Sequence, residues 1–204
     1  MIKKIIWTRI DTLFHGFQYL SEKDVIFYHL EYSRGGYQKS PANQWVFNYK
    51  KGIEHRNEPQ WSYKEEAIKK FAELIINTPI GDNRILLAGP PSKRRDSYLF
   101  DSRNEEVLNI VNKATGIPIS FNLGAIQDTE PIHIQGGYRS PERLRGLYEF
   151  VPFKNVPDIV YIVDDVITTG SHYVVWRDLI HQVHPEVEVR GIYLARTIND
   201  GSYV

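Results

Sequence analysis

The segment from Val160 to Trp176, VYIVDDVITTGSHYVVW, limits what this chain can fold into more than any other. A short apolar run passes directly into two adjacent aspartates. A turn rich in threonine, glycine and serine follows, and the chain then becomes apolar again. A short apolar run bounded by a turn is typical of a buried strand, and glycine permits a close approach and a sharp change of direction. We therefore expect a strand, a tight turn and a helix, in that order.

Strand-like and helix-like segments alternate along residues 61–204. The expected strands are RILLAG, IPISF, DIVYIV and VEVRGIYLA, and the expected helices are SYKEEAIKKFAELIINT, NEEVLNIVNKA and SHYVVWRDLIHQV. Ser62 and Glu65 have the spacing of a capping box at the start of the first helix. Strands that alternate with helices imply right-handed crossovers and a parallel sheet. The sequence predicts an α/β fold with a Rossmann-like parallel sheet.

Residues 1–60 differ from the rest of the chain in their pattern of strand-like and turn-like segments. The segments KKIIWTR, DVIFYHLEYS and QWVFNYK are separated by turn-rich pieces, which predicts a β-rich subregion. Its aromatic side chains are either core residues of half-buried strands or a stacking surface for a ring. A chain of 204 residues supports one full-sized core, so we expect a single domain over residues 1–204, with residues 61–204 as its α/β core.

Composition excludes several classes of protein. The 25 basic and 25 acidic residues give no net charge, so no overall field attracts nucleic acid or a membrane surface. The absence of cysteine excludes disulfides and thiolate zinc sites. The apolar run in MIKKIIWTRID is too short for a signal peptide, and no later run has the length of a membrane span. We expect a cytoplasmic protein.

The acid pair and the turn after it predict a ligand site. In open parallel sheets ligands bind at the carboxyl ends of the strands, where we expect Asp164 and Asp165. The N–H groups at a helix N-terminus bind anions, so a phosphorylated sugar would suit both the turn and the carboxylates. The alternative is a helix cap beside a solvated acid, which the complete string IVDDVITTGS disfavours. The chain lacks the glycine-rich turns of ATP and dinucleotide sites.

YIVDDVITTGS resembles the phosphoribosyl-pyrophosphate (PRPP) motif of the type I phosphoribosyltransferases. LLAGPPSK, SRNEEVL and LART resemble segments of the ComF-like, competence-associated branch, and QGGYRSPER is similar to its insert, although Gly146 stands where an asparagine is usual. The resemblance covers roughly residues 84–197 and is strongest at 160–171. It implies the type I phosphoribosyltransferase fold, in which a variable hood selects the acceptor, and residues 1–60 are the candidate hood. Unlike many ComF-like proteins, this chain does not begin with a cysteine-rich zinc module.

The resemblance also implies roles for single residues. Asp164 and Asp165 would hold the ribose hydroxyls of PRPP, directly or through Mg²⁺, and we take these two with Thr168 as the candidate catalytic residues. The 5′-phosphate would be bound by Thr168, Thr169, Gly170, Ser171 and His172. His172 stands where threonine is common, and it either donates to the phosphate or caps the helix. Thr168 stands where some members have an acid near the acceptor, so assistance to the acceptor must come from elsewhere.

The leaving pyrophosphate needs amides and cations. The loop PPSKRR offers Ser92, Lys93, Arg94 and Arg95. Each of these side chains is equally compatible with a solvated basic loop. In the polar insert between Gln127 and Phe150, Arg139 and Arg143 would belong to a mobile loop that closes over PRPP. Taken singly, each arginine is more typical of a solvent-exposed side chain that binds no ligand.

Two functions are consistent with these residues. The first is a Mg²⁺-dependent phosphoribosyltransferase that transfers the phosphoribosyl group of PRPP to a nucleobase-like or amine acceptor and releases pyrophosphate. The second is a catalytically inactive regulator that binds PRPP or a nucleotide. The basic pyrophosphate loop favours the enzyme, and zero net charge disfavours a nucleic-acid adaptor. An apolar sheet edge or helix face would support a homodimer.

Overall fold

The computed structural model describes residues 7–12, 16–129 and 140–198. In these residues six strands form a mostly parallel sheet in the order β1-β2-β8-β7-β3-β4, and β5 pairs with β6 in a separate antiparallel ribbon. Only β1 runs antiparallel to its neighbour in the main sheet. The strands are β1 (Thr8–Arg9), β2 (Val25–Ser33), β3 (Arg84–Ala88), β4 (Ile119–Ser120), β5 (Leu123–Ala125), β6 (Tyr148–Phe150), β7 (Ile159–Ile167) and β8 (Glu188–Ile198).

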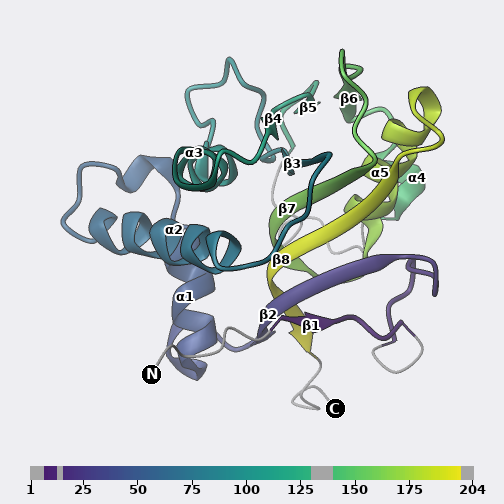
Figure 1. Cartoon of the computed structure of the whole chain (residues 1–204). Coiled ribbons are helices and arrows are strands. Elements are labelled where there is room, and N and C mark those ends of the chain that lie inside the picture. The colour runs from purple at the N-terminus through teal and green to yellow at the C-terminus, as the bar shows by residue number, and fades with distance from the viewer. Residues whose placement is uncertain (1–6, 13–15, 130–139, 199–204) are drawn as a thin grey trace.

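Helices cover both faces of the main sheet. They are α1 (Pro41–Tyr49), α2 (Trp61–Ile76), α3 (Arg103–Thr115), α4 (Pro141–Leu144) and α5 (Ser171–Val183), with 3-10 turns η1 (Tyr37–Lys39) and η2 (Ile53–His55). Helices α1, α2 and α3 lie on one face, while α5, α4 and the β5–β6 ribbon lie on the other (Figure 1). The described residues therefore form an α/β protein with a mostly parallel sheet, which is compatible with the expected Rossmann-like fold.

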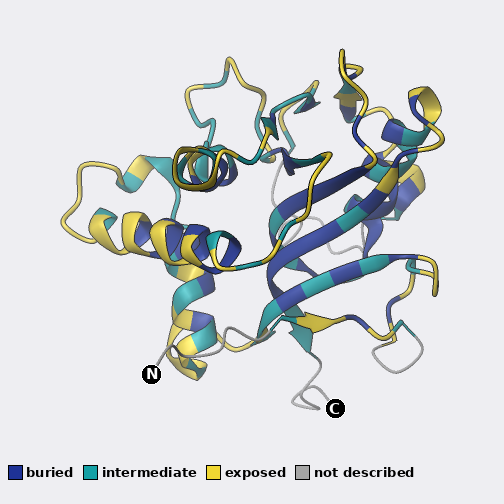
Figure 2. Cartoon of the chain, in the orientation of Figure 1, coloured by how far each residue is buried: buried dark blue, intermediate teal, exposed yellow. Residues whose placement is uncertain are grey.

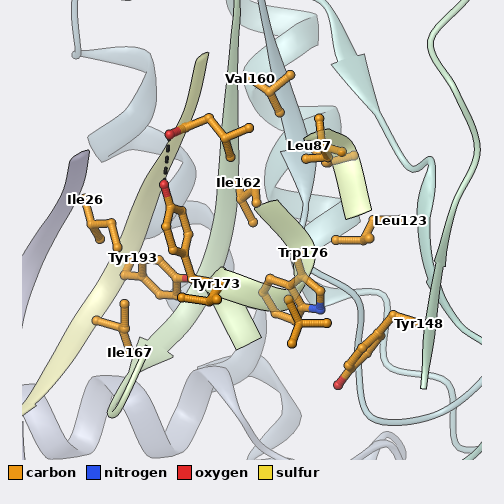
Figure 3. Packing of buried hydrophobic residues seen from close by; sticks show 14 of the residues in the cluster. Ile26, Leu87, Leu123, Tyr148, Val160, Ile162, Ile167, Tyr173, Trp176 and Tyr193 are labelled. Atoms are coloured by element: carbon orange, nitrogen blue, oxygen red, sulfur yellow. Dashed lines mark hydrogen bonds between the residues drawn. The ribbon is translucent and has the colours of Figure 1, made fainter. Parts of the chain in front are cut away.

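The side chains of the central strand β7 alternate between two cores. Val160 and Ile162 pack with Trp176 and other residues of α5, whereas Tyr161 and Val163 pack with α1, α2 and α3. Successive side chains of a strand point to opposite faces, so a strand buried on both faces is apolar throughout. Figure 2 shows the central strands buried and the outer face of α2 exposed, and Figure 3 shows the core on the α5 face.

The connections after β3 and β7 leave the sheet on opposite faces. From β3 the chain passes through α3 to β4, and from β7 it passes through α5 to β8 on the other face. Adjacent parallel strands whose connections diverge in this way leave a crevice at their carboxyl ends, which is where open α/β sheets bind ligands. A ligand site is therefore expected at the carboxyl ends of β3 and β7.

The strand expected at QWVFNYK is wrong, because this segment belongs to helix α1. Ser40 is the N-cap and its Oγ accepts a hydrogen bond of 3.0 Å from the N–H of Asn43, with Pro41 in the first turn. Serine before proline is a strong helix start. Val46 and Tyr49, three residues apart, are both buried against α2 and α3, so helical rather than alternating spacing buries the apolar side chains.

The other expectations for the N-terminal half have mixed outcomes. The strand DVIFYHLEYS is confirmed as β2, but β2 pairs in parallel with β8 and so belongs to the main sheet. Of the expected strand KKIIWTR, Thr8–Arg9 form β1, and residues 3–6 lie outside the described residues. Ser62 is not an N-cap, because α2 begins at Trp61 and the Ser62 hydroxyl donates to the carbonyl of Pro59 at 3.0 Å. Among the described residues, no helix has the length and apolar character needed to cross a membrane.

Candidate functional site

Asp164 and Asp165 lie within β7, not after it. Strand β7 continues to Ile167 because β8 pairs with it along this length, with Asp164 opposite Tyr193. On its other side β3 ends at Ala88, opposite Val163. The two aspartates therefore extend beyond the carboxyl end of β3 at the crevice, while β8 still holds their backbone. As successive residues of a strand, their side chains point to opposite faces of the sheet.

Asp165 lies on the α1–α3 face between two cations. Its Oδ2 is 2.6 Å from the Arg103 guanidinium, and its Oδ1 is 3.3 Å from Lys50 Nζ and accepts from the Val166 N–H at 2.6 Å. Only 7% of the Asp165 side chain is exposed. Burial acts to raise the pKa of Asp165, but Lys50, Arg103 and these hydrogen bonds outweigh it and hold the pKa below its usual range. Asp165 is therefore an ionised carboxylate.

Asp164 is half-buried and has a different environment. Its Oδ1 accepts a hydrogen bond of 2.9 Å from the Asn104 amide, which also donates to the carbonyl of Gly89 at 2.8 Å. A Cβ added at Gly89 would lie 3.0 Å from the Asp164 Cβ, so the loop after β3 passes close to this carboxyl. Burial and the charge of Asp165 raise the pKa of Asp164 to about 7. The pair thus combines one fixed anion with one carboxyl that titrates near neutral pH.

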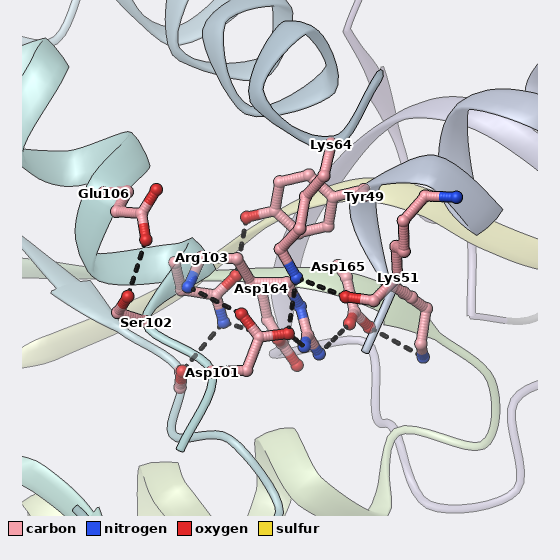
Figure 4. A network of polar contacts seen from close by, with 12 residues as sticks. Tyr49, Lys51, Lys64, Asp101, Ser102, Arg103, Glu106, Asp164 and Asp165 are labelled. Carbon is pink, nitrogen blue, oxygen red and sulfur yellow. Dashed lines mark hydrogen bonds and ion pairs between the residues drawn. The ribbon is translucent and has the colours of Figure 1, made fainter. Parts of the chain in front are cut away.

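A buried polar network supports the acid pair (Figure 4). Arg103 also donates to Asp101 at 2.6 Å, and Lys64, whose side chain is 1% exposed, donates to the same carboxylate at 2.7 Å. Tyr49 donates to Asn104 Oδ1 at 2.7 Å. Burial lowers the pKa of Lys64 and the charge of Asp101 opposes this effect. Charges buried without a partner are costly, so α1, α2 and α3 each contribute a group that fixes the position of the carboxylates.

The sequence did not identify the members of this network as site residues. They are Tyr49, Lys50, Lys64, Asp101, Arg103 and Asn104. The one local signal is the polar run DSRN at the start of α3, where a helix at the carboxyl end of β3 directs its first side chains toward the crevice. Lys50 and Lys64 have no such signal, because they come from helices that are placed only by packing.

The turn 168–171 leads from β7 into α5 as expected. Gly170 is the N-cap of α5 with φ +85°, a conformation that favours glycine. Thr169 Oγ1 and Ser171 Oγ are 2.6 Å apart, and the Thr168 hydroxyl is 2.8 Å from that of Thr197 at the end of β8. The first N–H groups of a helix have no acceptor within the helix, so the start of α5 has the donors that a phosphate needs.

Two neighbours of this turn complete its description. The N–H of Tyr19 donates to the Thr169 carbonyl at 3.2 Å, which places the segment before β2 beside the turn. His172 lies in the first turn of α5 with its ring 5.4 Å from that of Trp176. Because Gly170 is the N-cap, His172 does not cap the helix, and its donation to a phosphate stays a prediction.

The basic loop after β3 already has acidic partners. The Arg94 guanidinium pairs with Asp96, and that of Arg95 pairs with Glu105 at the start of α3. The Arg94 N–H donates to Asp128 at 2.8 Å, and the Thr129 N–H donates to the Ser92 carbonyl at 2.8 Å, so the loop is tied to the segment that precedes residue 130. Lys93 is half-buried. The role of these four residues toward pyrophosphate stays a prediction.

The two arginines of the insert have different outcomes. Arg139 lies outside the described residues. Arg143 is exposed on the short helix α4, which packs against α5 through the buried Leu144. Closure of this segment over a substrate stays a prediction.

The acid pair does not fit a directly bound Mg²⁺. Both oxygens of Asp165 already have partners in Lys50, Arg103 and the Val166 N–H, and two of these partners are cations, which repel a divalent metal ion. Across the described residues no group of three or more histidines or acids is placed to hold a metal ion. Asp164 is left as the carboxyl that can meet a hydrated ion, so the arrangement fits the indirect form of the metal role.

A groove of about 1040 Å³ lies elsewhere, beside the edge strand β4. It is lined by residues 80–85 at the start of β3, the segment 115–122, the segment 151–157 and Arg95. Neither aspartate nor the turn 168–171 lines it. The candidate site at the carboxyl ends of β3 and β7 is therefore separate from this groove. No protein-family model and no curated protein matches the chain.

Proposed function

We propose that this protein is a phosphoribosyltransferase that takes PRPP, as its Mg²⁺ complex, and transfers the phosphoribosyl group to a nucleobase-like or amine acceptor. The observation that carries the proposal is the juxtaposition of the acid pair with the N-terminus of α5 at the crevice between β3 and β7. The carboxylates suit the hydroxyls of a sugar, and the helix N-terminus suits its phosphate. One ligand with both groups at this spacing is a ribose 5-phosphate.

The two carboxyl groups would act differently on the ribose. Asp165 is ionised, and its Oδ2, which has Arg103 as its partner, keeps a lone pair that can accept a hydrogen bond from a hydroxyl. Asp164, with its pKa raised to about 7, exists in both protonation states near neutral pH and is held in place by Asn104. Both carboxyls are positioned before the ligand arrives, which reduces the free-energy cost of binding.

The reaction replaces pyrophosphate by nitrogen at C1 of the ribose. The bond from C1 to the pyrophosphate oxygen breaks and both electrons leave with pyrophosphate. The lone pair of the acceptor nitrogen forms the new bond to C1, and that nitrogen releases a proton to solvent. The protein then needs to position the reactants and stabilise the departing negative charge. Because the acid pair does not fit a protein-bound metal, Mg²⁺ enters with PRPP as part of the substrate.

A PRPP-binding regulator without transfer activity is the second candidate. It is favoured by the pairing of Arg94 with Asp96 and of Arg95 with Glu105, which occupies the two guanidinium groups of the pyrophosphate loop. A sensor needs the ribose and 5′-phosphate contacts but need not stabilise a leaving group. The two candidates therefore differ in pyrophosphate release and not in PRPP binding.

The first test is calorimetric titration of the protein with PRPP, with and without Mg²⁺. The variant Asp164→Asn/Asp165→Asn should lose saturable binding while its far-ultraviolet circular dichroism stays that of the wild type. Asp82→Asn, which removes an exposed carboxylate near the N-terminal end of β3, is the matched control and should bind as the wild type does.

The second test separates the enzyme from the regulator. Protein that binds PRPP is incubated with single nucleobases and amines, and released pyrophosphate is measured. Release that requires both an acceptor and the acid pair supports the enzyme, and PRPP binding without release for any acceptor supports the regulator. Wild-type protein that binds no PRPP in either condition would rule out both.

A further inference from the structure

Lys50 comes from the N-terminal region of the chain but reaches the acid pair. It is the C-cap residue of α1, where its N–H donates to carbonyls of the last turn. Its Nζ lies 3.3 Å from Oδ1 of Asp165, although 115 residues separate the two in sequence. Of the two cations that contact Asp165, Lys50 is the more exposed, with 47% of its side chain accessible against 16% for Arg103. An incoming ligand would therefore meet Lys50 first.

The contact between Lys50 and Asp165 is suited to exchange. Charge-assisted N–H···O hydrogen bonds are usually about 2.7–2.9 Å long, and the distance of 3.3 Å is longer. Ion pairs with an exposed partner contribute little to stability because water screens them. Arg103, at 2.6 Å and nearly buried, would keep Asp165 paired if Lys50 turned to another anion. The ammonium of Lys50 can thus change partner without leaving a buried charge uncompensated.

The chemistry of PRPP indicates which anion Lys50 would meet. In PRPP the pyrophosphate on C1 and the hydroxyls on C2 and C3 lie on the same face of the ribose ring, and the 5-phosphate group lies on the other. A carboxylate that accepts from these hydroxyls is therefore on the pyrophosphate side of the sugar. A cation 3.3 Å from that carboxylate lies within reach of the pyrophosphate oxygens.

We propose that Lys50 binds the pyrophosphate group of PRPP, exchanging Asp165 for a phosphate oxygen when the substrate enters. The proposal rests on the proposed function of the acid pair. It gives the N-terminal region a direct part in the reaction, because a cation beside the leaving group stabilises the charge that develops when the C1–O bond breaks. It also supplies a cation beyond Arg94 and Arg95, whose guanidinium groups are paired with Asp96 and Glu105.

The test compares three ligands on the folded protein. Wild type, Lys50→Gln and Lys50→Arg are titrated with PRPP, inorganic pyrophosphate and ribose 5-phosphate, the last of which keeps the ribose and the 5-phosphate but lacks pyrophosphate. Lys50→Gln should weaken PRPP and pyrophosphate binding about tenfold or more, because a charge-assisted hydrogen bond is lost. Its affinity for ribose 5-phosphate should stay within about twofold. Lys50→Arg should keep most of the PRPP affinity.

Lys51→Gln is the matched control. Lys51 is the next residue, it has the same charge, and its backbone carbonyl accepts from Lys64 whatever its side chain is. This variant should bind all three ligands as the wild type does. If Lys50→Gln and Lys51→Gln weakened PRPP binding equally, the loss would be a general charge effect, and the proposal would be overturned.

The remaining outcomes separate failure of this proposal from failure of the proposed function. If Lys50→Gln weakens the binding of ribose 5-phosphate as much as the binding of PRPP, Lys50 acts by holding Asp165 and does not contact pyrophosphate. If Lys50→Gln changes the affinity for neither ligand, the ion pair between Lys50 and Asp165 has no part in binding. Both results overturn the role of Lys50 but leave PRPP binding intact. Wild-type protein that binds neither PRPP nor ribose 5-phosphate would overturn the proposed function, and this proposal with it.

Discussion

Replacing Arg103 by methionine removes the cation that lies between Asp101 and Asp165 and keeps an unbranched side chain about as long as the aliphatic part of arginine. Arg103 is 2.6 Å from each carboxylate, and these side chains are 11% and 7% exposed. Breaking a buried ion pair by removing one partner costs about 3–5 kcal/mol. Here each carboxylate keeps one lysine, at 2.7 Å for Asp101 and 3.3 Å for Asp165. We therefore expect a loss at the lower end, about 3 kcal/mol.

The free energy of unfolding is measured by urea titration, with tryptophan fluorescence and circular dichroism as two probes. Glu66→Gln is the control, because it breaks an exposed pair with Lys70 on α2 and should cost less than about 1 kcal/mol. In the cycle with Asp165→Asn, the double variant should be more stable than the sum of the single losses predicts, by at least about 1 kcal/mol. A cost for Arg103→Met as small as that of the control, with an unchanged urea slope, would refute the network as the support of the acid pair.

Three further outcomes are expected. Burial and Asp165 raise the pKa of Asp164 to about 7, so ionising this acid destabilises the fold as pH rises from about 4 to about 7. The free energy of unfolding of Asp164→Asn relative to the wild type should therefore be more favourable at about pH 8 than at about pH 5. An equal difference at both pH values would contradict this. Gly170 and Gly146 both have φ +85°, but only at Gly170 would a Cβ lie 2.5 Å from Leu20, so urea titration should show Gly170→Ala to be less stable than Gly146→Ala by about 1 kcal/mol or more. Tyr49→Phe removes a buried hydrogen bond of 2.7 Å to α3, so it should lower the free energy of unfolding by about 1–2 kcal/mol and lower the affinity for PRPP measured by calorimetry. Unchanged PRPP affinity would show that this bond does not position the site.

The limits of α5 and the position of β7 could be predicted because their signals are consecutive in the chain. The helix expected from Ser171 to Val183 has those bounds in the structure, with Gly170 as its N-cap. Apolar runs and a glycine at the turn act within a few residues. Helix α1 also had a local signal in Ser40 and Pro41, but its aromatic residues indicated a strand, and burial of Val46 and Tyr49 at helical spacing decided otherwise.

The sequence predicted a strand that ends at the acid pair, followed by the turn into a helix; the structure has the turn and the helix, but β7 continues past Asp164 and Asp165 to Ile167. The sequence did not determine what surrounds the two acids. The length of β7 past the acids depends on β8, and the partners of Asp165 come from residues 62 and 115 positions away. No local pattern encodes such contacts, because they arise only when α1 and α3 pack on the same face of the sheet. The sequence thus specifies the acid pair and the turn that follows it, and the tertiary packing decides which cations lie beside the acids and the charge that each carboxyl carries.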